Sequence, residues 1–325
     1  MNPGISLAVC AALSVLSFAA QAQSDASYPT RRIHYVIPSS PGAGADYPAR
    51  LLSDRLTKAL GQPVIAENRP GASWTIGTEY VTRQPADGYT IMHAAQIHVL
   101  NPSFFPKLPY DPITDFDAIS HAVSTIFVMP IRPAIPANSI QEFIALARAH
   151  PGKYSFGSVG SGSSHHLGGA LLEAMTGIKM LHVPFKGGSQ IVQALLAGEI
   201  DATFISVFPV TKFIQAGKLR GLAVTTSYRS SLLPDIPTME QGAGLKGYDM
   251  DVWQGVLAKA GTPRAVINRL NREIVAIVRD KAEAQRMREA GFEPAGSTPE
   301  QFTELMKADM AKWSKLIREA GIKGE

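Results

Sequence analysis

The chain has 325 residues, a formal net charge of +4 and a single cysteine, Cys10. Lysine and arginine are spread along the sequence without clustering beside aromatic residues, which argues against a nucleic-acid-binding protein. One cysteine forms no disulfide within the chain, and the scattered histidines include no His-Glu-x-x-His pair. We therefore expect neither a metal site nor a cofactor.

Residues 1–22 predict a signal peptide. The stretch from Ile5 to Ala20 is uncharged and mostly apolar, and Ala20-Gln21-Ala22 has the small-x-small form of a signal-peptidase site. We therefore expect export, with cleavage near Ala22 and a mature chain without Cys10. No later segment is long and apolar enough to span a bilayer.

Residues 33–93 alternate short β-branched runs with helical periodicity, which predicts an α/β fold. We expect strands at 33–37, 63–66 and 89–93. Asp46 begins a helix whose apolar stripe runs to Leu60, and Gly61 ends it. A shorter helix is expected near residues 76–83.

A proline-rich stretch, residues 101–116, interrupts this alternation, and the strand-like run 124–131 then carries the chain into a second domain. There we expect strands at 154–157, 180–183 and 203–207 and helices at 140–149, 165–175 and 191–197. The run 221–225 carries the chain back to a helical C-terminus. We predict two α/β domains joined by two crossings. Residues 23–125 plus 228–325 form domain 1, and residues 126–227 form domain 2.

Two glycine-rich turns, residues 38–46 and 157–164, each lie between a predicted strand and a predicted helix. Such a turn leaves backbone N–H groups at the positive end of the helix dipole, where an anion binds. Ligands of open α/β sheets bind outside the carboxyl ends of the strands, so we expect the two turns to face each other across a cleft. The candidate ligand contacts in the two turns are Ser39, Pro41, Gly42, Ala43, Gly44, Ala45, Asp46, Ser158, Ser161, Ser163, Ser164 and His165.

Further candidates adjoin these turns or follow other strands. Gln96 and His98 belong to the expected loop after the third strand, and Phe185 and Gly187 belong to a third turn that leads into a helix. For Asp46 we favour a helix-capping role over a ligand contact, because its carboxylate would repel an anionic ligand. We also expect Gly44 to have a positive φ that a β-branched residue would block.

Two enzyme classes are possible rivals. Gly42-x-Gly44 followed by Glu67 imitates a dinucleotide-binding fingerprint, but Tyr47 occupies the position of its third glycine. An exported hydrolase built on residues 158–164 lacks the Gly-x-Ser-x-Gly pattern of a nucleophile elbow. We therefore expect a binding protein that is not an enzyme.

The order of motifs along the chain identifies a family. They are Tyr28-Pro29, residues 38–46 followed by Ala49-Arg50, Gly61-Gln-Pro-Val64, Glu67-Asn-Arg-Pro-Gly-Ala72, Ile76-Gly77, Asp87-Gly-Tyr-Thr90, Asn101-Pro102, Leu108-Pro-Tyr-Asp111, Pro151-Gly-Lys153, His182-Val-Pro-Phe-Lys-Gly187, Gly217-Lys-Leu-Arg220 and Leu233-Pro-Asp-Ile-Pro-Thr238. Together they resemble the periplasmic substrate-binding proteins of tripartite tricarboxylate transporters, also called Bug receptors. The resemblance covers essentially the whole chain after the signal peptide.

The resemblance implies a two-lobed, periplasmic-binding-protein-like (type II) Venus flytrap that closes on a small carboxylate in the periplasm. It also implies membrane permease subunits as partners, and we expect the receptor itself to be a monomer. In such receptors the loop after the first strand and the loop that begins a second-domain helix hold the ligand. These loops correspond here to residues 39–46 and 158–165. A ligand sensor that is not coupled to transport remains an alternative.

Three departures from the family pattern concern the ligand. In the first turn, Ala43 separates the glycines that are usually paired, and Tyr47 follows Asp46. The turn after Pro70 reads Gly71-Ala-Ser-Trp74. Phe185 occupies a position that is often tyrosine in the family. Tyr47 and Trp74 offer a flat apolar wall that suits an aromatic carboxylate. If Trp74 packs between its loop and the lobe instead, the ligand is an aliphatic di- or tricarboxylate. Both alternatives stay open at this point.

Overall fold

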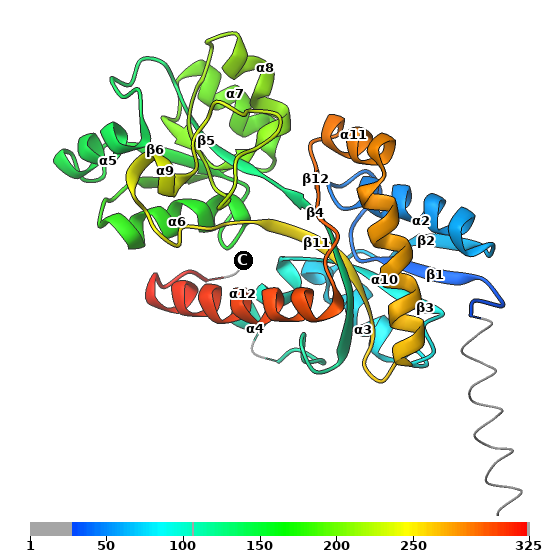
Figure 1. Cartoon of the computed structure of the whole chain (residues 1–325). Helices are drawn as coiled ribbons and strands as arrows, with labels where there is room; N and C mark the ends of the chain where they lie inside the picture. Colours follow the sequence, from blue (N-terminus) through cyan, green and yellow to red (C-terminus); the bar gives the residue numbers. More distant parts are fainter. Residues whose placement is uncertain (1–27, 106, 324–325) are drawn as a thin grey trace, which may run out of the picture.

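A computed structural model describes residues 28–105 and 107–323 (Figure 1). The predicted signal peptide and Cys10 lie outside the described residues. The described chain forms two β-sheets, each covered by helices, and this confirms the predicted α/β class. Figure 1 shows the two sheets and their helices as separate lobes, with the strands β4 and β11 running between them.

The first sheet has six strands in the order β12-β4-β11-β3-β1-β2. β1 (Ile33–Ile37) lies between β2 (Val64–Asn68) and β3 (Thr90–Ala95) and pairs in parallel with both. The remaining pairs are antiparallel and involve β4 (Phe116–Thr125), β11 (Val252–Lys259) and β12 (Glu293–Pro294). The three strands that we predicted for residues 33–93 are therefore confirmed within a residue or two at each end.

Helices cover both faces of the first sheet, so that each face has its own apolar core. They are α2 (Asp46–Leu60), the short 3₁₀ helix η1 (Ala72–Trp74), α3 (Thr75–Thr82), α4 (Ile97–Phe104), α10 (Arg264–Arg279), α11 (Lys281–Glu289) and α12 (Pro299–Glu319). α2 ends where Gly61 adopts a left-handed φ of 68°. α12 begins with a capping box between Thr298 and Gln301.

The second sheet has the order β10-β5-β8-β6-β7, and β9 pairs separately with β5. Its strands are β5 (Phe127–Ile131), β6 (Ser155–Ser158), β7 (Leu181–Pro184), β8 (Ala202–Thr203), β9 (Ile205–Ser206) and β10 (Arg220–Val224). β6 is parallel to β7 and β8. The surrounding helices are α5 (Ile140–Ala149), α6 (Ser164–Thr176), α7 (Gly188–Ala197), α8 (Val207–Gln215) and α9 (Met239–Ala243).

The chain passes between the sheets twice. β4 ends at Thr125 in the first sheet, and β5 begins at Phe127 in the second sheet. We predicted the return at residue 228, but α9 packs against α5 and β10, and Tyr248 donates a hydrogen bond to Gly168 O in α6. The chain re-enters the first sheet with β11, so we place the return at Val252.

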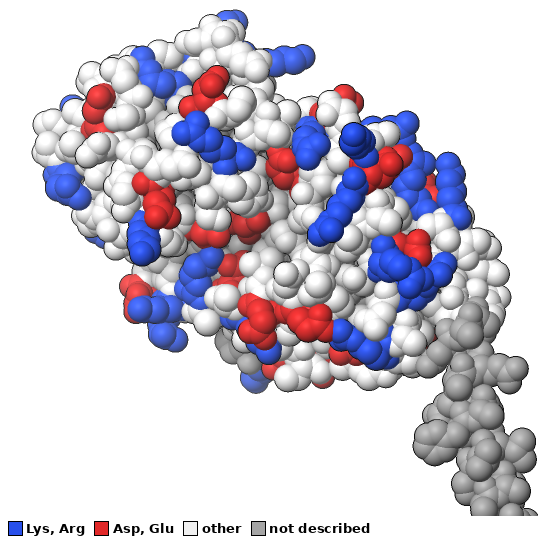
Figure 2. Space-filling view, viewed as in Figure 1, with Lys and Arg blue, Asp and Glu red and all other residues white. Residues whose placement is uncertain are grey.

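The described part of the chain has no helix that combines the length and the apolar character needed to cross a bilayer. In Figure 2, acidic and basic side chains are interspersed over the visible face and form no extended region of one sign. Such a surface has no dominant field for steering a large polyanion.

Candidate ligand-binding site

The carboxyl ends of β1, β2 and β3 lie at one edge of the first sheet, because these strands are parallel. The first loop, which we define as residues 38–45, follows β1, while η1 follows β2 and α4 follows β3. Asn68 Nδ2 at the end of β2 donates to Ser39 O at 3.0 Å. A Cβ on Gly77 of α3 would lie 2.9 Å from Pro38 Cβ. The first loop and the η1–α3 segment therefore lie side by side.

Asp46 closes the first loop on itself. Its Oδ2 accepts from Gly42 N at 2.9 Å, and its Oδ1 accepts from Asn68 Nδ2 at 2.8 Å. Burial alone would raise the pKa of Asp46, but the hydrogen bonds from Arg50, Gly42 and Asn68 outweigh it and lower the pKa to about 2. The predicted capping role is wrong, because Ala45 is the N-cap and makes no side-chain capping bond in the described chain. Asp46 instead fixes the loop as a carboxylate.

The glycines of the first loop differ in backbone conformation. Gly42 has a φ of 77°, in the left-handed region, whereas Gly44 does not have a positive φ. A Cβ at Gly44 would meet nothing within 4 Å. The expectation that Gly44 needs a positive φ is therefore wrong, and Gly42 is the position that requires glycine.

The other residues of the first loop differ in exposure. Pro41 and Gly44 are exposed, Ala43 is half-buried and Ala45 is buried. The side chain of Ser39 lies beneath the loop with 6% of its surface exposed. Its Oγ has no hydrogen-bond partner among the described residues. A buried hydroxyl without a partner is costly, which makes Ser39 a candidate donor to a ligand.

Tyr47 packs against the end of the first lobe that carries β12. Its ring stacks on Phe292 with centroids 6.0 Å apart and planes 8° apart, and its hydroxyl points to Arg286 O. The side chain keeps 44% of its surface exposed. Together with the first loop and Arg286, it lines a cavity of about 450 Å³ on α2. The ligand contact of Tyr47 stays a prediction.

Trp74 ends an unusual backbone segment. Ala72, Ser73 and Trp74 have φ values of 44°, 51° and 77°, so three consecutive residues other than glycine are left-handed. Asn101 Nδ2 of α4 donates to Ser73 O at 2.9 Å and holds the segment in place. Strained backbone of this kind is often found at binding sites. The Trp74 side chain is half-buried, and its ligand contact stays a prediction.

Gln96 and His98 do not line a cleft, contrary to our expectation. α4 begins at Ile97, directly after β3, so neither residue belongs to an open loop. Gln96 Nε2 donates to Asp251 O and to Asp309 Oδ2, both at 3.1 Å. His98 is buried among aromatic rings, its Nε2 lies 2.9 Å from Pro112 O, and burial lowers its pKa to about 4. Both side chains are 1% exposed and belong to the interior of the first lobe.

The second loop, which we define as residues 158–163, connects β6 to α6. Ser163 is the N-cap of α6, and its Oγ accepts from His166 N at 3.3 Å. Ser158 is fully buried, and its Oγ bonds to both backbone groups of Gly160. Ser161 Oγ donates to Lys323 O at 2.7 Å. Ser164 is half-buried in the first turn of α6. Several of these hydroxyls therefore shape the loop itself.

His165 follows in the first turn of α6, and its ring meets Phe127 edge-on with centroids 5.1 Å apart. Its Nδ1 is buried and has no partner within the part of the chain that the structure describes. Burial lowers the pKa of His165 to about 4, so the imidazole is neutral at neutral pH. A neutral ring with one unpaired nitrogen is able to exchange a hydrogen bond with a ligand.

Phe185 and Gly187 lie in the turn between β7 and α7. Gly187 is the N-cap of α7, has an extended φ of −173° and makes no side-chain capping bond within the described residues. Phe185 packs partly against the core beneath it. Phe185, Lys186 and Gln190 line a cavity of about 650 Å³ together with Val159 and Gly160 of the second loop. The second loop and the α7 turn therefore border the same space.

One cavity is lined by both lobes. It has a volume of about 240 Å³. The first lobe contributes Ser73 of η1, Ile97 and Phe104 of α4, and Phe105; the second lobe contributes residues 159–163 of the second loop. None of its nine lining residues is charged. Its polar groups are therefore backbone amides and the hydroxyls of three serines.

The cavity contains residues that the sequence analysis did not select. Phe104 comes so close to the second loop that a Cβ on Gly162 would lie 2.6 Å from Phe104 Cζ. Ile97 and Phe105 lie at the two ends of α4, which we had not predicted as a helix. The sequence signal for α4 was a short apolar run that ends in Phe104-Phe105. Pro102 lies inside this run, and because an internal proline usually breaks a helix, the run did not read as helical.

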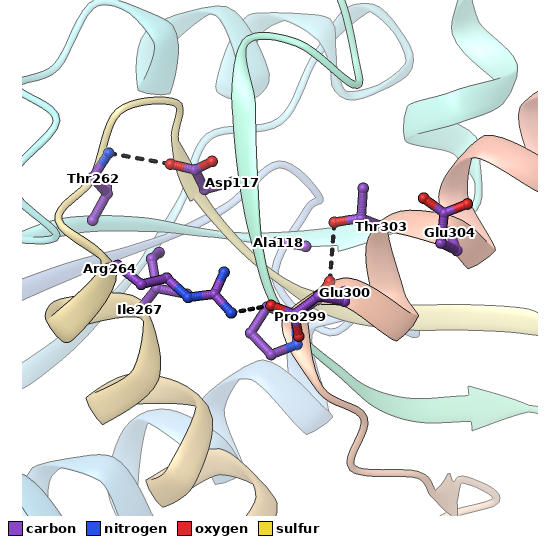
Figure 3. Close-up of a pocket in the computed structure, with 9 residues that line it drawn as sticks. All are labelled: Asp117, Ala118, Thr262, Arg264, Ile267, Pro299, Glu300, Thr303 and Glu304. Carbon is purple, nitrogen blue, oxygen red and sulfur yellow. Dashed lines mark hydrogen bonds and ion pairs between the residues drawn. The ribbon is translucent and has the colours of Figure 1, made fainter.

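Figure 3 shows another cavity, which involves none of the predicted site residues. It has a volume of about 220 Å³ and lies where α10, α12 and β4 come together in the first lobe. Arg264 forms an ion pair with Glu300, and Thr262 N donates to Asp117 at 3.2 Å. Arg264 and Glu300 pair with each other and Asp117 accepts from backbone amides, so the cavity is a weaker ligand-site candidate than the one between the lobes.

Comparison with known proteins identifies the family. The sequence model of one protein family, the tripartite tricarboxylate transporter family receptor, matches residues 48–322 of this chain. The chain belongs to this family. Among its relatives, BugT of Bordetella pertussis is 32% identical over 313 residues, which is 96% of this chain and 95% of BugT. A Pseudomonas protein encoded between tcbD and tcbE is 36% identical over 312 residues, covering 95% of this chain and 92% of that protein.

Solved structures of similar proteins confirm the predicted family fold. An R. palustris protein with adipate has a TM-score of 0.74 and 33% identity, covering 91% of this receptor and 99% of that chain. The periplasmic binding protein BugD has a TM-score of 0.71 and 31% identity, with coverages of 92% and 100%. MatC from Rhodopseudomonas palustris with bound malate has a TM-score of 0.70 and 26% identity, with coverages of 89% and 100%. Two of these three structures thus hold a carboxylate, adipate in one and malate in the other.

Proposed function

We propose that this receptor captures a small carboxylate between its two lobes for a tripartite tricarboxylate-type transporter. The observation that carries the proposal is the cavity lined by both lobes, in which the second loop meets η1 and α4. The amides and hydroxyls that the second loop contributes lie at the N-terminus of α6, where the helix dipole favours an anion. Ser39 Oγ on the first lobe and His165 Nδ1 on the second have no partner among the described residues and are able to form further hydrogen bonds with a ligand.

The ligand that fits best is a small aliphatic dicarboxylate of about the size of malate or adipate. Similar structures hold those two acids. Trp74 is not among the residues that line the cavity between the lobes, and Tyr47 stacks on Phe292. Both observations favour packing roles for these rings over an aromatic wall. The aromatic carboxylate is therefore the second candidate.

The setting of this function is the periplasm. Known relatives are periplasmic binding proteins, and residues 1–22 have the composition of a cleavable signal peptide. The monomeric receptor would present its ligand-closed form to the permease subunits. For the permease subunits to distinguish the ligand-bound receptor from the free receptor, the ligand must bind the closed form more tightly than the open form. Intact-mass measurement of the exported protein tests the leader: a chain beginning at Gln23 is expected, and retention of Met1 contradicts it.

The alternative of a hydrolase has one supporting contact. His182 Nε2 lies within hydrogen-bond distance of Ser158 Oγ, which resembles a nucleophile and its base. The Ser158 side chain is fully buried, however, and its hydroxyl donates to Gly160 O at 3.1 Å. An acyl group would have no access to that oxygen. Turnover of a simple activated ester that disappears in Ser158→Ala would favour the hydrolase over the receptor.

A thermal-shift screen followed by calorimetry tests the receptor. Adipate, malate, succinate, citrate and benzoate are compared with adipamide, which has the size of adipate but no charge. A true ligand raises the melting temperature in proportion to the logarithm of its concentration and is recovered unchanged. We expect a dicarboxylate to stabilise the protein and adipamide to have no effect. Equal stabilisation by adipamide, or none by any carboxylate, would exclude the proposed anion site.

A further inference from the structure

Two imidazole rings lie stacked beneath the second loop. His166 belongs to the first turn of α6 and His182 belongs to β7. Their ring centroids are 4.0 Å apart and their planes differ by 1°. Phe156 of β6 packs against both rings. Each imidazole also makes a hydrogen bond to the second loop, so the pair connects the loop to three separate elements.

His166 holds the outer part of the loop. Gly162 N donates to His166 Nδ1 at 3.1 Å. Gly162 has a φ of 77°, and its backbone lies against the Phe104 ring of the first lobe. The bond from His166 therefore fixes the loop at the point where the two lobes meet. Nδ1 accepts this bond only while it carries no proton.

His182 holds the inner part of the loop through Ser158. Ser158 Oγ bonds to both Gly160 O and His182 Nε2, and an Nε2–H group is able to donate to Oγ while the hydroxyl donates to Gly160 O. That bond persists whether the His182 ring is neutral or charged. The two histidines thus differ, because acid breaks the contact of His166 with the loop but leaves the contact of His182 intact.

We propose that the stacked pair of His166 and His182 positions residues 158–162 for ligand binding, and that protonation of His166 releases the loop. The inference rests on the proposed function, since it takes the second loop as part of the ligand site. Neither histidine is proposed to touch the ligand. They act through Gly162 and Ser158, and so are positioning residues.

The surroundings of His166 favour its neutral form. Burial, together with the smaller effect of the adjacent His182 ring, lowers the pKa of His166 to about 4. The groups that face the ring are His182 on β7 and the apolar Phe156 on β6. On α6, the neighbouring His165 faces Phe127 instead. The loop is therefore held at neutral pH and released as the pH falls through about 4.

Three variants separate positioning from folding. His166→Asn places an amide oxygen the same number of bonds from Cα as Nδ1 and does not titrate. His166→Phe keeps the stacked ring and removes the acceptor. His182→Gln keeps a donor at the position of Nε2. His150→Asn serves as the matched control, because His150 is an exposed residue at the end of α5, away from the loop.

The first measurement uses the Gly162 amide as a probe. In the ¹⁵N-labelled, ligand-free protein, its NMR shift is followed from pH 7.5 to pH 3.5. We expect the signal to titrate near pH 4 in wild type and in His150→Asn, and to stay constant in His166→Asn. In His166→Phe it should be displaced at every pH. A signal that titrates identically in wild type and His166→Asn overturns the inference.

The second measurement is affinity for adipate and malate by calorimetry at pH 7 and pH 4.5. The ratio of variant to wild-type dissociation constants at each pH cancels the ionisation of the acids themselves. We expect His166→Phe to weaken binding about tenfold at pH 7 and His166→Asn to stay within about twofold. Unchanged affinity in His166→Phe contradicts the positioning role. If wild type binds neither acid, the proposed function fails, while the Gly162 signal still decides whether the pair holds the loop.

Discussion

Ser124 donates a hydrogen bond to Asp251 at 2.9 Å, and this bond joins the two segments that cross between the lobes. Tyr228 donates to the same carboxylate oxygen at 3.1 Å. The other oxygen, Asp251 Oδ1, is buried without a partner among the described residues. A buried and incompletely paired carboxylate therefore lies where the lobes are connected.

The ionisation of Asp251 predicts how stability depends on pH. Burial and the nearby Asp249 and Asp309 raise the pKa of Asp251 to about 7, against the hydrogen bonds from Ser124 and Tyr228. The folded protein then holds a proton that the unfolded chain releases between about pH 4 and pH 7. Stability from this group is present at low pH and is lost as the pH rises through about 7, by about 4 kcal/mol.

Denaturant titrations from pH 4 to pH 8 test this prediction. We expect Asp251→Asn to lose less stability over that range than wild type, because the amide does not ionise. The difference between the two curves isolates Asp251 from all other titrating groups. Ser124→Ala is a control that keeps the carboxylate and removes one of its donors, so its decline should be steeper. Parallel curves for wild type and Asp251→Asn would contradict the raised pKa.

A matched pair of glycine variants tests the first loop. Gly42 has a φ of 77° and Gly44 does not have a positive φ. Gly42→Ala should cost about 1 kcal/mol of unfolding free energy, because a side chain is strained in the left-handed region. Gly44→Ala should be neutral or stabilise by about 0.5 kcal/mol, because it restricts only the unfolded chain. Urea unfolding of both variants measures the difference, and equal costs would show that the two positions do not differ.

The sequence was sufficient for the three parallel strands of the first lobe and for the strands of the second lobe, but not for β11, β12 and most of β4. Glycines and capping residues indicated these elements locally, as Gly61 does at the end of α2. The sequence was not sufficient for α4, because Pro102 lies inside that helix and the helix is held by packing against α12. That error placed Gln96 and His98 in an open loop. The left-handed Ala72–Trp74 segment was also unpredictable, because a tertiary bond from Asn101 to Ser73 holds it.

Trp74 offers a direct test of ligand class. The residue has a φ of 77°, which glycine adopts without strain, so Trp74→Gly relieves backbone strain of about 1 kcal/mol. Its ring does not line the cavity between the lobes. We expect Trp74→Gly to bind adipate within about twofold of wild type. Calorimetry with adipate and benzoate decides the matter, since benzoate binding that is lost in Trp74→Gly would establish the aromatic wall.

Ser39 provides the sharpest separation between folding and binding. Its Oγ is buried without a partner in the part of the chain that the structure describes, and its side chain is 6% exposed. Removing an unsatisfied buried hydroxyl costs no hydrogen bond, so Ser39→Ala should unfold at the same or a slightly higher temperature than wild type. If the hydroxyl donates to the ligand, the same variant should bind the dicarboxylate about tenfold more weakly. Ser53→Ala is the matched control, because Ser53 Oγ donates a hydrogen bond to Val64 O at 2.6 Å. This variant should be less stable than wild type without a direct effect on affinity. A Ser39→Ala protein that is destabilised and binds normally would assign this hydroxyl to the fold and remove it from the site.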